Sequence, residues 1–367
     1  MVRLLLDEIS PNKMAEKLTH IRIVGAGLIG TSIGLALKGV GVKVSIRDSD
    51  PRAEALARDL LEDIDDQSGS SEQLCIIATP PDSIADVISQ ELSRNPGLRV
   101  MDISSIKTKP LLDVSKTSLD PAFFAATHPM AGREVSGPES ARGDLFIGRP
   151  WVLTPEGVDP SLLAHVKEVI GICGGALMIR SAADHDRAVA QVSHLPQILS
   201  SLLAGSLNRA HQEDLELAGS GLRDTTRLAD SNPELWGQIL SGNAEALRPL
   251  LISLQNDLST IINGLDENAV AQELIASGRR GRARIPGKHG GQSREYFLVA
   301  VVIDDKPGQL AAIIESCAQI QVNIEDLQIE HTPGQETGLI TLSFAPQDGQ
   351  KVMSHLQEQG WKVHPSR

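Results

Sequence analysis

The hydrophobic positions in the first half of the chain alternate between short strand-like runs and helical periods. Residues 21–24 form an apolar β-type run, and residues 28–38 then carry apolar side chains at helical spacing. The same alternation predicts further strands at 42–46, 74–78, 98–103, 123–127 and 151–154, and helices at 51–61 and 82–93. Strands and helices that alternate in this way predict a doubly wound α/β domain over residues 18–180.

The pattern changes twice after residue 180. Long helical periods without strand signals predict an all-helical domain over 181–277, whose many apolar faces indicate a homodimer. An arginine- and glycine-rich segment at 278–294 is typical of a flexible, solvated linker, with a functional basic patch as a second interpretation. Residues 295–367 follow the order β-α-β-β-α-β, which predicts a ferredoxin-like domain. Its strands are expected at 296–303, 322–330, 338–344 and 361–364, and its helices at 307–319 and 348–359.

Composition and charge argue against nucleic-acid binding and membrane binding. The sequence has 34 Lys and Arg against 47 Asp and Glu, a net charge of −13, and only 3 Trp, 1 Tyr and 5 Phe. Such a surface repels nucleic acids and anionic membranes, and few aromatic side chains are present to stack on bases. Because neither a membrane-spanning run nor a secretory signal is recognisable, we expect a cytoplasmic protein. The 3 cysteines lack metal or redox spacing, so we expect reduced, mostly buried thiols and no metal site.

A glycine-rich turn lies between the first predicted strand and helix. Its G-x-G-x-x-G pattern permits a tight turn, a close approach of the backbone to a pyrophosphate, and close helix–strand packing. Asp48 follows Gly30 by 18 residues, where an acid binds ribose hydroxyls and repels a 2′-phosphate. We therefore expect a Rossmann-like site for NAD, although the neighbouring Arg47 keeps NADP open. The expected cofactor-binding residues are Gly25, Ala26, Gly27, Leu28, Ile29, Gly30, Asp48 and Thr79.

Two of the 10 histidines have a sequence context that suits catalysis. His128 follows a strand-like run, and ligands bind at the carboxyl ends of strands in such sheets. His194 precedes Pro196 in the helical domain, where the proline should bend the helix. A hydroxyl within segment 102–107 can bond an imidazole and fix its tautomer. The arginines within 223–227 suit a carboxylate, with a surface salt bridge to the aspartate of that segment as a second interpretation.

These segments together resemble the prephenate/arogenate dehydrogenase family of tyrosine biosynthesis, in its order and spacing over roughly residues 20–265. The resemblance implies that prephenate is oxidised by NAD to 4-hydroxyphenylpyruvate and CO₂. The similar motifs are the glycine turn, Asp102–Lys107, His128–Gly132 with Ser136-Gly137 after it, Ser193–Pro196, Asp224–Arg227 and Ser231–Trp236.

The resemblance also implies roles for single residues. His128 accepts the proton of the substrate hydroxyl, and Ser105 orients both groups. Arg227 binds a substrate carboxylate, and His194 contacts the pyruvyl side chain. An ionic network at the site entrance and a nearby tryptophan complete the site; in the better-known version of the network, lysine stands at the position of Arg223. The implied substrate-binding residues are Arg227, His194, Glu134, Arg223, Asp224 and Trp236.

The C-terminal domain resembles an ACT domain in its turn-plus-helix and the strand that follows. This resemblance implies regulation by an amino-acid effector such as tyrosine, and a purely dimerising role is the second interpretation. The implied regulatory residues are Asp304, Pro307, Gly308, Leu310, Asn323 and Ile324.

Three alternatives to prephenate oxidation remain. A phosphoglycerate-type dehydrogenase with an ACT tail would carry its glycine turn in mid-chain, whereas here the turn starts at Gly25. Arogenate, oxidised with NAD or NADP, would present an ammonium group to His194, which favours the keto acid instead. A catalytically silent nucleotide and amino-acid sensor would not need His128, Ser105 and Arg227.

Overall fold

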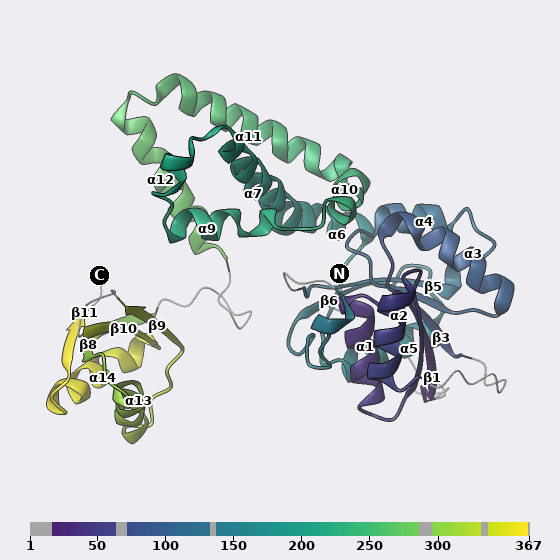
Figure 1. The fold of residues 1–367 in the computed structure, drawn as a ribbon, viewed down its shortest axis with the longest axis horizontal. Coiled ribbons are helices and arrows are strands. Elements are labelled where there is room, and N and C mark those ends of the chain that lie inside the picture. Colours follow the sequence, from purple (N-terminus) through teal and green to yellow (C-terminus); the bar gives the residue numbers. More distant parts are fainter. Residues whose placement is uncertain (1–16, 64–71, 133–136, 286–295, 332–336, 366–367) are drawn as a thin grey trace. The chain divides into compact units, whose positions relative to one another are not determined.

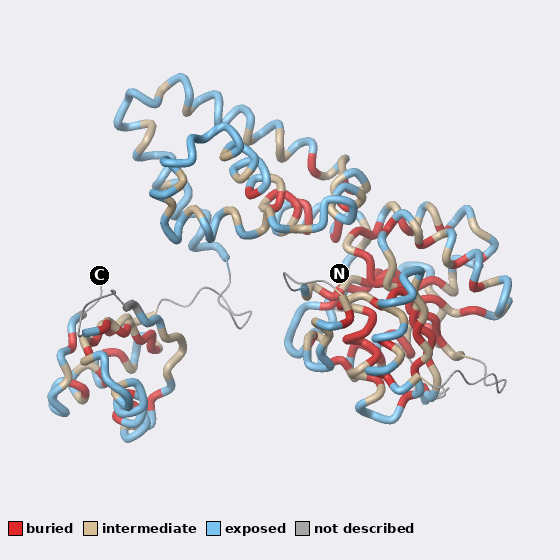
Figure 2. Tube along the Cα trace, in the orientation of Figure 1, coloured by how far each residue is buried: buried red, intermediate tan, exposed pale blue. Residues whose placement is uncertain are grey.

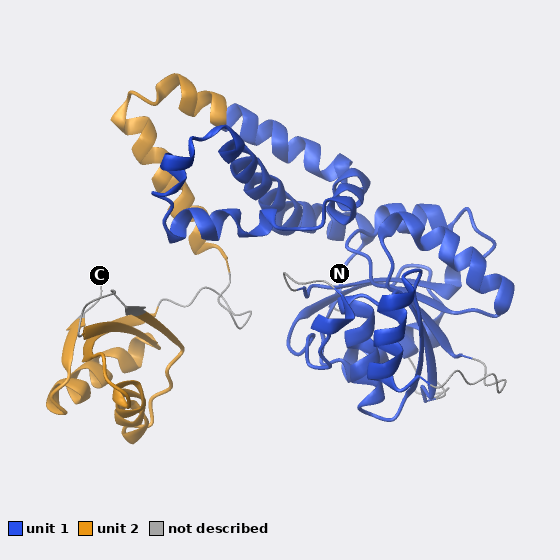
Figure 3. Ribbon diagram, viewed as in Figure 1, with its two compact units in different colours: residues 1–257 blue, residues 258–367 orange. Residues whose placement is uncertain are grey.

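The structure is a computed structural model that describes residues 17–63, 72–132, 137–285, 296–331 and 337–365. The chain divides into two compact units, residues 1–257 and 258–367 (Figure 3). The first unit contains the α/β sheet and most of the helices that follow it, and the second contains the C-terminal sheet (Figure 1). We describe each unit by itself.

The first unit is built on a seven-stranded sheet in the order β2-β1-β3-β4-β5-β6-β7. The first five strands of this order are parallel, whereas β6 and β7 run in the opposite direction. The carboxyl ends of β1, β3, β4 and β5 therefore lie at one edge of the sheet, where ligands bind in such folds. The strands are β1 (His20–Val24), β2 (Lys43–Arg47), β3 (Leu74–Ile77), β4 (Val100–Asp102), β5 (Phe124–Pro129), β6 (Pro150–Thr154) and β7 (Ala176–Ile179).

Helices cover both faces of this sheet, as the alternation of apolar segments predicts. Leu74 and Ile76 of β3 pack in one buried cluster with residues of α1, α2 and α5. Cys75 and Ile77 face the other way and pack with residues of α3 and α4. Much of the buried backbone of this unit lies in the sheet and the helices around it (Figure 2). The doubly wound fold is thus confirmed. These helices are α1 (Leu28–Lys38), α2 (Pro51–Leu61), α3 (Ile84–Arg94), α4 (Thr108–Val114) and α5 (Pro160–Ile172).

The chain then becomes helical, and no strand occurs in the described residues from 181 to 285. The segment expected as one bent helix is α6, a π turn at Ala190–His194, and α7. Because Pro196 has no N–H group and its ring crowds the preceding turn, a regular helix cannot continue through this segment. The helices are α6 (Ala182–Val189), α7 (Leu195–Ser206), α8 (Gln212–Leu215), α9 (Ser220–Thr226), α10 (Pro233–Gly242), α11 (Ala244–Gly264) and α12 (Asn268–Ala283).

Part of the segment expected to be a linker belongs to helix α12. We expected residues 278–294 to be a flexible linker, but the helix continues through Ala283. Arginine and alanine are good helix formers, and they outweigh the cost of Gly278 and Gly281. The remainder of the expected linker, from residue 286, lies outside the described residues.

The second unit contains an antiparallel sheet in the order β11-β8-β10-β9. This order and the β-α-β-β-α-β succession confirm the ferredoxin-like arrangement. Strand β9 starts at Asp326, four residues later than the expected start at 322. A Cβ on Gly349 would lie 1.9 Å from the Phe297 ring, so α14 packs closely on β8. The elements are β8 (Phe297–Asp304), α13 (Gln309–Gln319), β9 (Asp326–His331), β10 (Thr337–Phe344), α14 (Pro346–Glu358) and β11 (Lys362–Pro365).

Cys75, Cys173 and Cys317 are free and buried, as expected. Burial raises the pKa of the Cys173 thiol to about 12 and that of the Cys317 thiol to about 11. The pKa of the Cys75 thiol is raised for the same reason. Because thiolates are the reactive form, these three residues serve the core rather than chemistry.

Candidate active site

The turn between β1 and α1 requires glycine at two positions. Gly25 has a φ of +114°, and a Cβ there would lie 2.5 Å from the carbonyl oxygen of Ala78. A Cβ on Gly30 would lie 2.1 Å from the Gly25 carbonyl oxygen. Gly27, at the start of α1, has no heavy atom within 4 Å of the position that a Cβ would take. This open approach to a helix N-terminus suits an anionic group.

Polar groups that follow β2 and β3 lie beside this turn. Asp48 Oδ2 accepts a hydrogen bond from the Ala26 N–H at 2.6 Å, which ties the end of β2 to the turn. The Thr79 hydroxyl follows β3, and it is buried without a hydrogen-bond partner among the described residues. Because a buried hydroxyl without a partner is costly, this oxygen suits a ligand atom. The Arg47 guanidinium contacts Asp63 at 3.0 Å.

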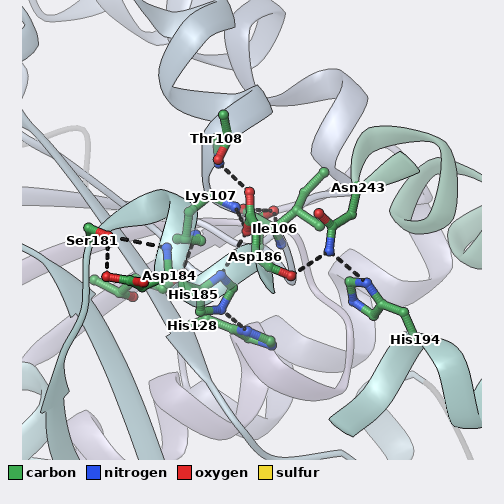
Figure 4. Close-up of polar contacts among 12 residues, drawn as sticks. Ile106, Lys107, Thr108, His128, Ser181, Asp184, His185, Asp186, His194 and Asn243 are labelled. Atoms are coloured by element: carbon green, nitrogen blue, oxygen red, sulfur yellow. Dashed lines mark hydrogen bonds and ion pairs between the residues drawn. The ribbon is translucent and has the colours of Figure 1, made fainter. Parts of the chain in front are cut away.

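Three polar side chains form a row at the carboxyl end of β5 (Figure 4). His128 Nδ1 lies 2.9 Å from His185 Nε2, and His185 Nδ1 lies 2.8 Å from Asp186 Oδ1. His128 comes from β5 and is half-buried, whereas the other two come from α6 and are buried. We name this set the His–His–Asp row.

A buried ion pair lies next to the strand that carries His128. Lys107 Nζ donates to both carboxylate oxygens of Asp102, at 2.9 and 2.7 Å, and to the Thr127 carbonyl. Asp102 also accepts from the Thr127 N–H at 2.9 Å, so the pair joins the end of β4 to the residue before His128. Both charged side chains are 0% exposed. A buried pair of this kind costs much to break, and it holds β5 in place.

His194 lies at the end of the π turn and is held by two neighbours. Asn243 Nδ2 donates to the Asp186 carbonyl at 2.8 Å, and it also lies 3.0 Å from His194 Nδ1. Because the carbonyl can only accept, the amide nitrogen must be the donor in both contacts. His194 Nδ1 is therefore an acceptor, and Nε2 carries the proton of the neutral ring. Trp236 contacts this ring edge-on, with 6.0 Å between ring centroids.

The arginine-bearing segment packs against α7. Gln197 Nε2 donates to the Leu228 carbonyl at 2.6 Å, which ties the residue after Arg227 to the helix that follows His194. Arg223, Asp224 and Arg227 are exposed in this chain. No ion pair joins Arg223 to Asp224 in the described part of the chain.

The comparisons with known proteins agree with this geometry. Residues 33–179 match the family model "Prephenate dehydrogenase, nucleotide-binding domain", and residues 181–276 match "Prephenate dehydrogenase, dimerization domain". "Probable prephenate dehydrogenase NovF" of Streptomyces niveus is 31% identical over 356 residues, which cover 93% of this chain and 98% of that protein. The chain belongs to the prephenate dehydrogenase family.

Solved structures in this family have the same fold. A prephenate dehydrogenase of Aquifex aeolicus, solved with hydroxyphenyl propionate and NAD⁺, is 26% identical with a TM-score of 0.63. The match covers 73% of this chain and 99% of that one. An arogenate dehydrogenase of Synechocystis is 28% identical with a TM-score of 0.58, covering 72% and 99%. The nucleotide-binding region of the prephenate dehydrogenase family thus carries Asp48, Thr79 and His128, and the dimerization region carries His194 and Arg227.

The two histidines of this prephenate dehydrogenase family member have low pKa values. Burial lowers the pKa of His128 well below 6.5, and the nearness of His185, Lys107 and His194, all groups that become positive on protonation, lowers it further. Burial lowers the pKa of His194 to about 4, although Asp186 opposes that shift. Both rings are therefore neutral at pH 7, so His128 has a lone pair that can accept a proton.

Sequence reasoning and the structure differ on which residues surround His128. Sequence reasoning missed His185, Asp186 and Asn243, which the structure places in contact with one another and with the two expected histidines. A His-Asp pair one helix before His194 was the available signal, but helical periodicity does not say which partner it meets. No hydrogen bond joins Ser105 to His128 within the described residues. Glu134 lies outside the described residues.

No group of three or more His, Cys, Asp or Glu residues in the described ranges could hold a metal ion. Among the same residues, no helix is both long and apolar enough to cross a membrane.

Proposed function

We propose that the protein is an NAD-dependent prephenate dehydrogenase that converts prephenate to 4-hydroxyphenylpyruvate and CO₂. The observation that carries the proposal is His128, a neutral imidazole held at the ligand-binding edge of a dinucleotide-type sheet. Prephenate carries a ring hydroxyl whose proton must leave as the ring carbon loses hydride. A positioned neutral histidine suits that task.

NAD fits the residues around the glycine turn. Gly27 leaves room for a pyrophosphate, and the Thr79 hydroxyl, which has no partner among the described residues, offers a hydrogen bond to the pyrophosphate or to a ribose. Asp48 supplies the negative charge that favours ribose hydroxyls over a 2′-phosphate, and Arg47 is engaged by Asp63. When bound, NAD accepts the hydride. The chain's own residues supply alignment, proton transfer and carboxylate binding.

Two glycine variants separate the roles of the turn. We expect Gly25→Ala to destabilise the fold by about 1–3 kcal/mol, because the new Cβ meets the Ala78 carbonyl at a positive φ. Gly27→Ala has open space and should keep the wild-type melting temperature but lose NAD binding, because its methyl occupies the pyrophosphate approach. Thermal unfolding and NAD titration measure both. Tight NAD binding by Gly27→Ala would contradict this placement of the cofactor.

The substrate side of the site favours a keto acid. A net charge of −13 opposes a dianion, so the carboxylates of prephenate need cations such as Arg227. The Nε2–H of His194 is a hydrogen-bond donor, which suits a keto or carboxylate oxygen and not an ammonium group. Arogenate remains the second candidate because the Synechocystis arogenate dehydrogenase has the same fold at 28% identity.

The test is initial-rate measurement with prephenate and arogenate, each with NAD and NADP, followed by the near-ultraviolet absorbance of the reduced nicotinamide. We expect the highest kcat/KM with prephenate and NAD. Turnover of arogenate alone would overturn the assignment of His194 and leave His128 as the base. Preference for NADP would overturn the role of Asp48.

The low pKa of His128 predicts the shape of the pH profile. The base must be unprotonated, so kcat/KM should stay level from neutral pH to below pH 6.5 and fall only at lower pH. Protein stability also declines there, since His194 binds its proton near pH 4 when folded but near its ordinary 6.5 when unfolded. Preincubation at each pH, followed by assay at pH 7, separates unfolding from titration. An acid limb centred above pH 6.5 would contradict a neutral His128.

We propose that three regions of the chain have different functions. Residues 18–180 bind NAD, residues 181–277 complete the substrate site and form a homodimer, and residues 295–367 form an ACT regulatory domain. Exposed apolar side chains on α7 and α11, including Leu202 at 64% and Ile262 at 67%, support the dimer. Light scattering of the full chain measures its mass in solution, and a monomer would contradict the dimer.

The ACT assignment rests on the β11-β8-β10-β9 sheet and on the turn before α13. Gly308, the N-cap residue just before that helix, has a φ of +92°, a backbone conformation that favours glycine. We propose that an aromatic amino acid such as tyrosine binds near the segment from Asp304 to Leu310 and the residues Asn323 and Ile324. Calorimetric titration with tyrosine tests this, and absence of binding would leave the domain a dimerising role.

A further inference from the structure

We propose that His185 and Asp186 are positioning residues that hold His128 with its proton on Nδ1 and share the proton that Nε2 gains during the reaction. Neither residue touches the reacting atoms directly. The part about the reaction rests on the proposed function, whereas the part about the His128 tautomer is a property of the protein alone.

Asp186 determines which atoms donate and which accept along the His–His–Asp row. Its Oδ1 accepts from the Lys107 N–H at 2.8 Å, and its Oδ2 accepts from the Thr108 N–H at 2.8 Å (Figure 4). Burial alone would raise the pKa of this carboxyl, but hydrogen bonds from His185, Thr108 and Lys107 lower it. Asp186 is therefore an acceptor at both oxygens, and backbone donors fix its orientation.

The rest of the row follows from this fixed acceptor. His185 Nδ1 must donate to Asp186, so in the neutral ring Nε2 has only a lone pair. That lone pair faces His128 Nδ1 at 2.9 Å, so His128 must donate from Nδ1. The Nε2 of His128 is then the unprotonated nitrogen. It is the atom that can take a proton from a substrate hydroxyl.

The charges around His128 favour transfer toward Asp186 once the ring is protonated. From the loop after β4, Lys107 is neutralised by Asp102 at 2.7 Å. From the π turn, His194 is neutral, with a pKa of about 4. From α6, Asp186 supplies the negative charge, one imidazole away. The row can therefore spread the positive charge of a protonated His128 over two rings and a carboxylate.

The reaction returns the proton to the oxygen that released it. Hydride leaves the ring carbon, with oxidised nicotinamide as its acceptor, while the hydroxyl proton moves to His128 Nε2 and a ketone forms. The bond to the ring carboxylate then breaks, CO₂ departs, and its electron pair completes the aromatic ring and leaves negative charge on the former hydroxyl oxygen. That oxygen takes back the proton, so the overall reaction releases none. The row thus stores one proton between hydride departure and aromatisation.

The tautomer can be measured without substrate or cofactor. In ¹⁵N-histidine-labelled protein near pH 7, long-range ¹H–¹⁵N correlation distinguishes protonated from unprotonated ring nitrogens, and the His128 signals are those absent from His128→Asn. We expect a protonated Nδ1 and an unprotonated Nε2 on His128. A protonated Nε2 with a bare Nδ1 would overturn the proposal, whatever substrate the enzyme uses.

Variants of α6 test the kinetic role. His185→Phe keeps a ring but removes the acceptor, and we expect kcat to fall about 10²-fold, with a mixed His128 tautomer and little change in KM. His185→Gln restores an acceptor oxygen, so it should recover the Nδ1–H tautomer and part of the rate. Asp186→Asn places an amide against backbone donors and should lower kcat similarly, whereas Asp184→Asn, an exposed carboxylate two residues earlier, should not.

The outcomes separate this proposal from the proposed function. Wild-type kcat in both His185→Phe and Asp186→Asn would overturn the positioning role even if prephenate is the substrate. If the wild-type protein turns over neither prephenate nor arogenate, the proposed function fails, and the NMR measurement still decides the tautomer. Circular dichroism and melting temperature identify any variant that does not fold. The NMR measurement of the His128 tautomer uses the wild-type protein and needs a variant only to assign the His128 signals.

Discussion

Replacing His128 by asparagine is expected to lower kcat for prephenate at least about 100-fold, the lower end of the loss for a general base. The asparagine amide can still reach His185 from the position of Nδ1, but nothing replaces Nε2. The NAD dissociation constant and the melting temperature should stay at their wild-type values, because the glycine turn and the Lys107–Asp102 pair are untouched. Steady-state kinetics and NAD titration measure these quantities.

A suitable control for this variant is His211→Asn, which makes the same change at an exposed histidine. It should leave kcat and KM unchanged. If His128→Asn retained a kcat within a few-fold of wild type, His128 would not be the base. The His–His–Asp row would then have only a structural role.

Replacing Arg227 by alanine is expected to raise the KM for prephenate roughly 10- to 150-fold, which corresponds to losing a charged hydrogen bond of about 1.5–3 kcal/mol. Binding should suffer more than kcat because the carboxylate is held in both the ground state and the transition state. Arg227→Lys keeps the charge without the bidentate geometry, so its KM should lie between the two.

The control for Arg227 is Arg187→Ala, which removes an exposed arginine of α6 that pairs with Asp184. Both variants change the net charge by the same amount. A difference between their KM values therefore comes from the substrate site and not from the overall charge of the protein. An unchanged KM in Arg227→Ala would remove this residue from the carboxylate site.

Sequence reasoning succeeded where local chemistry decides the structure. The glycine turn is recognisable because a positive φ at Gly25 and the close approach at Gly30 leave no other residue type. The strand pattern is equally local: the continuous apolar run of β3 is buried on both faces, and its alternate residues enter two different clusters. These features are set by residues close together in the sequence or by burial alone.

Sequence reasoning failed where distant segments meet. The adjacent His185 and Asp186 are visible in the sequence, but their partners are not, because these are His128, 57 residues from His185, and the backbone of Lys107, 79 residues from Asp186. The reversed direction of β6 likewise depends on how a long connection returns to the sheet. In the expected linker, glycine and charge suggested flexibility, yet the arginines and alanines of α12 form a helix through Ala283.

The most direct test of the account is the stoichiometry of wild-type turnover with prephenate and NAD. 4-Hydroxyphenylpyruvate is quantified by chromatography and NADH by absorbance in the same samples. We expect equal amounts of the two products at every time point. If NAD binds but neither prephenate nor arogenate yields NADH, the protein is not a dehydrogenase of these substrates, and the sensor alternative gains the support that the enzyme loses.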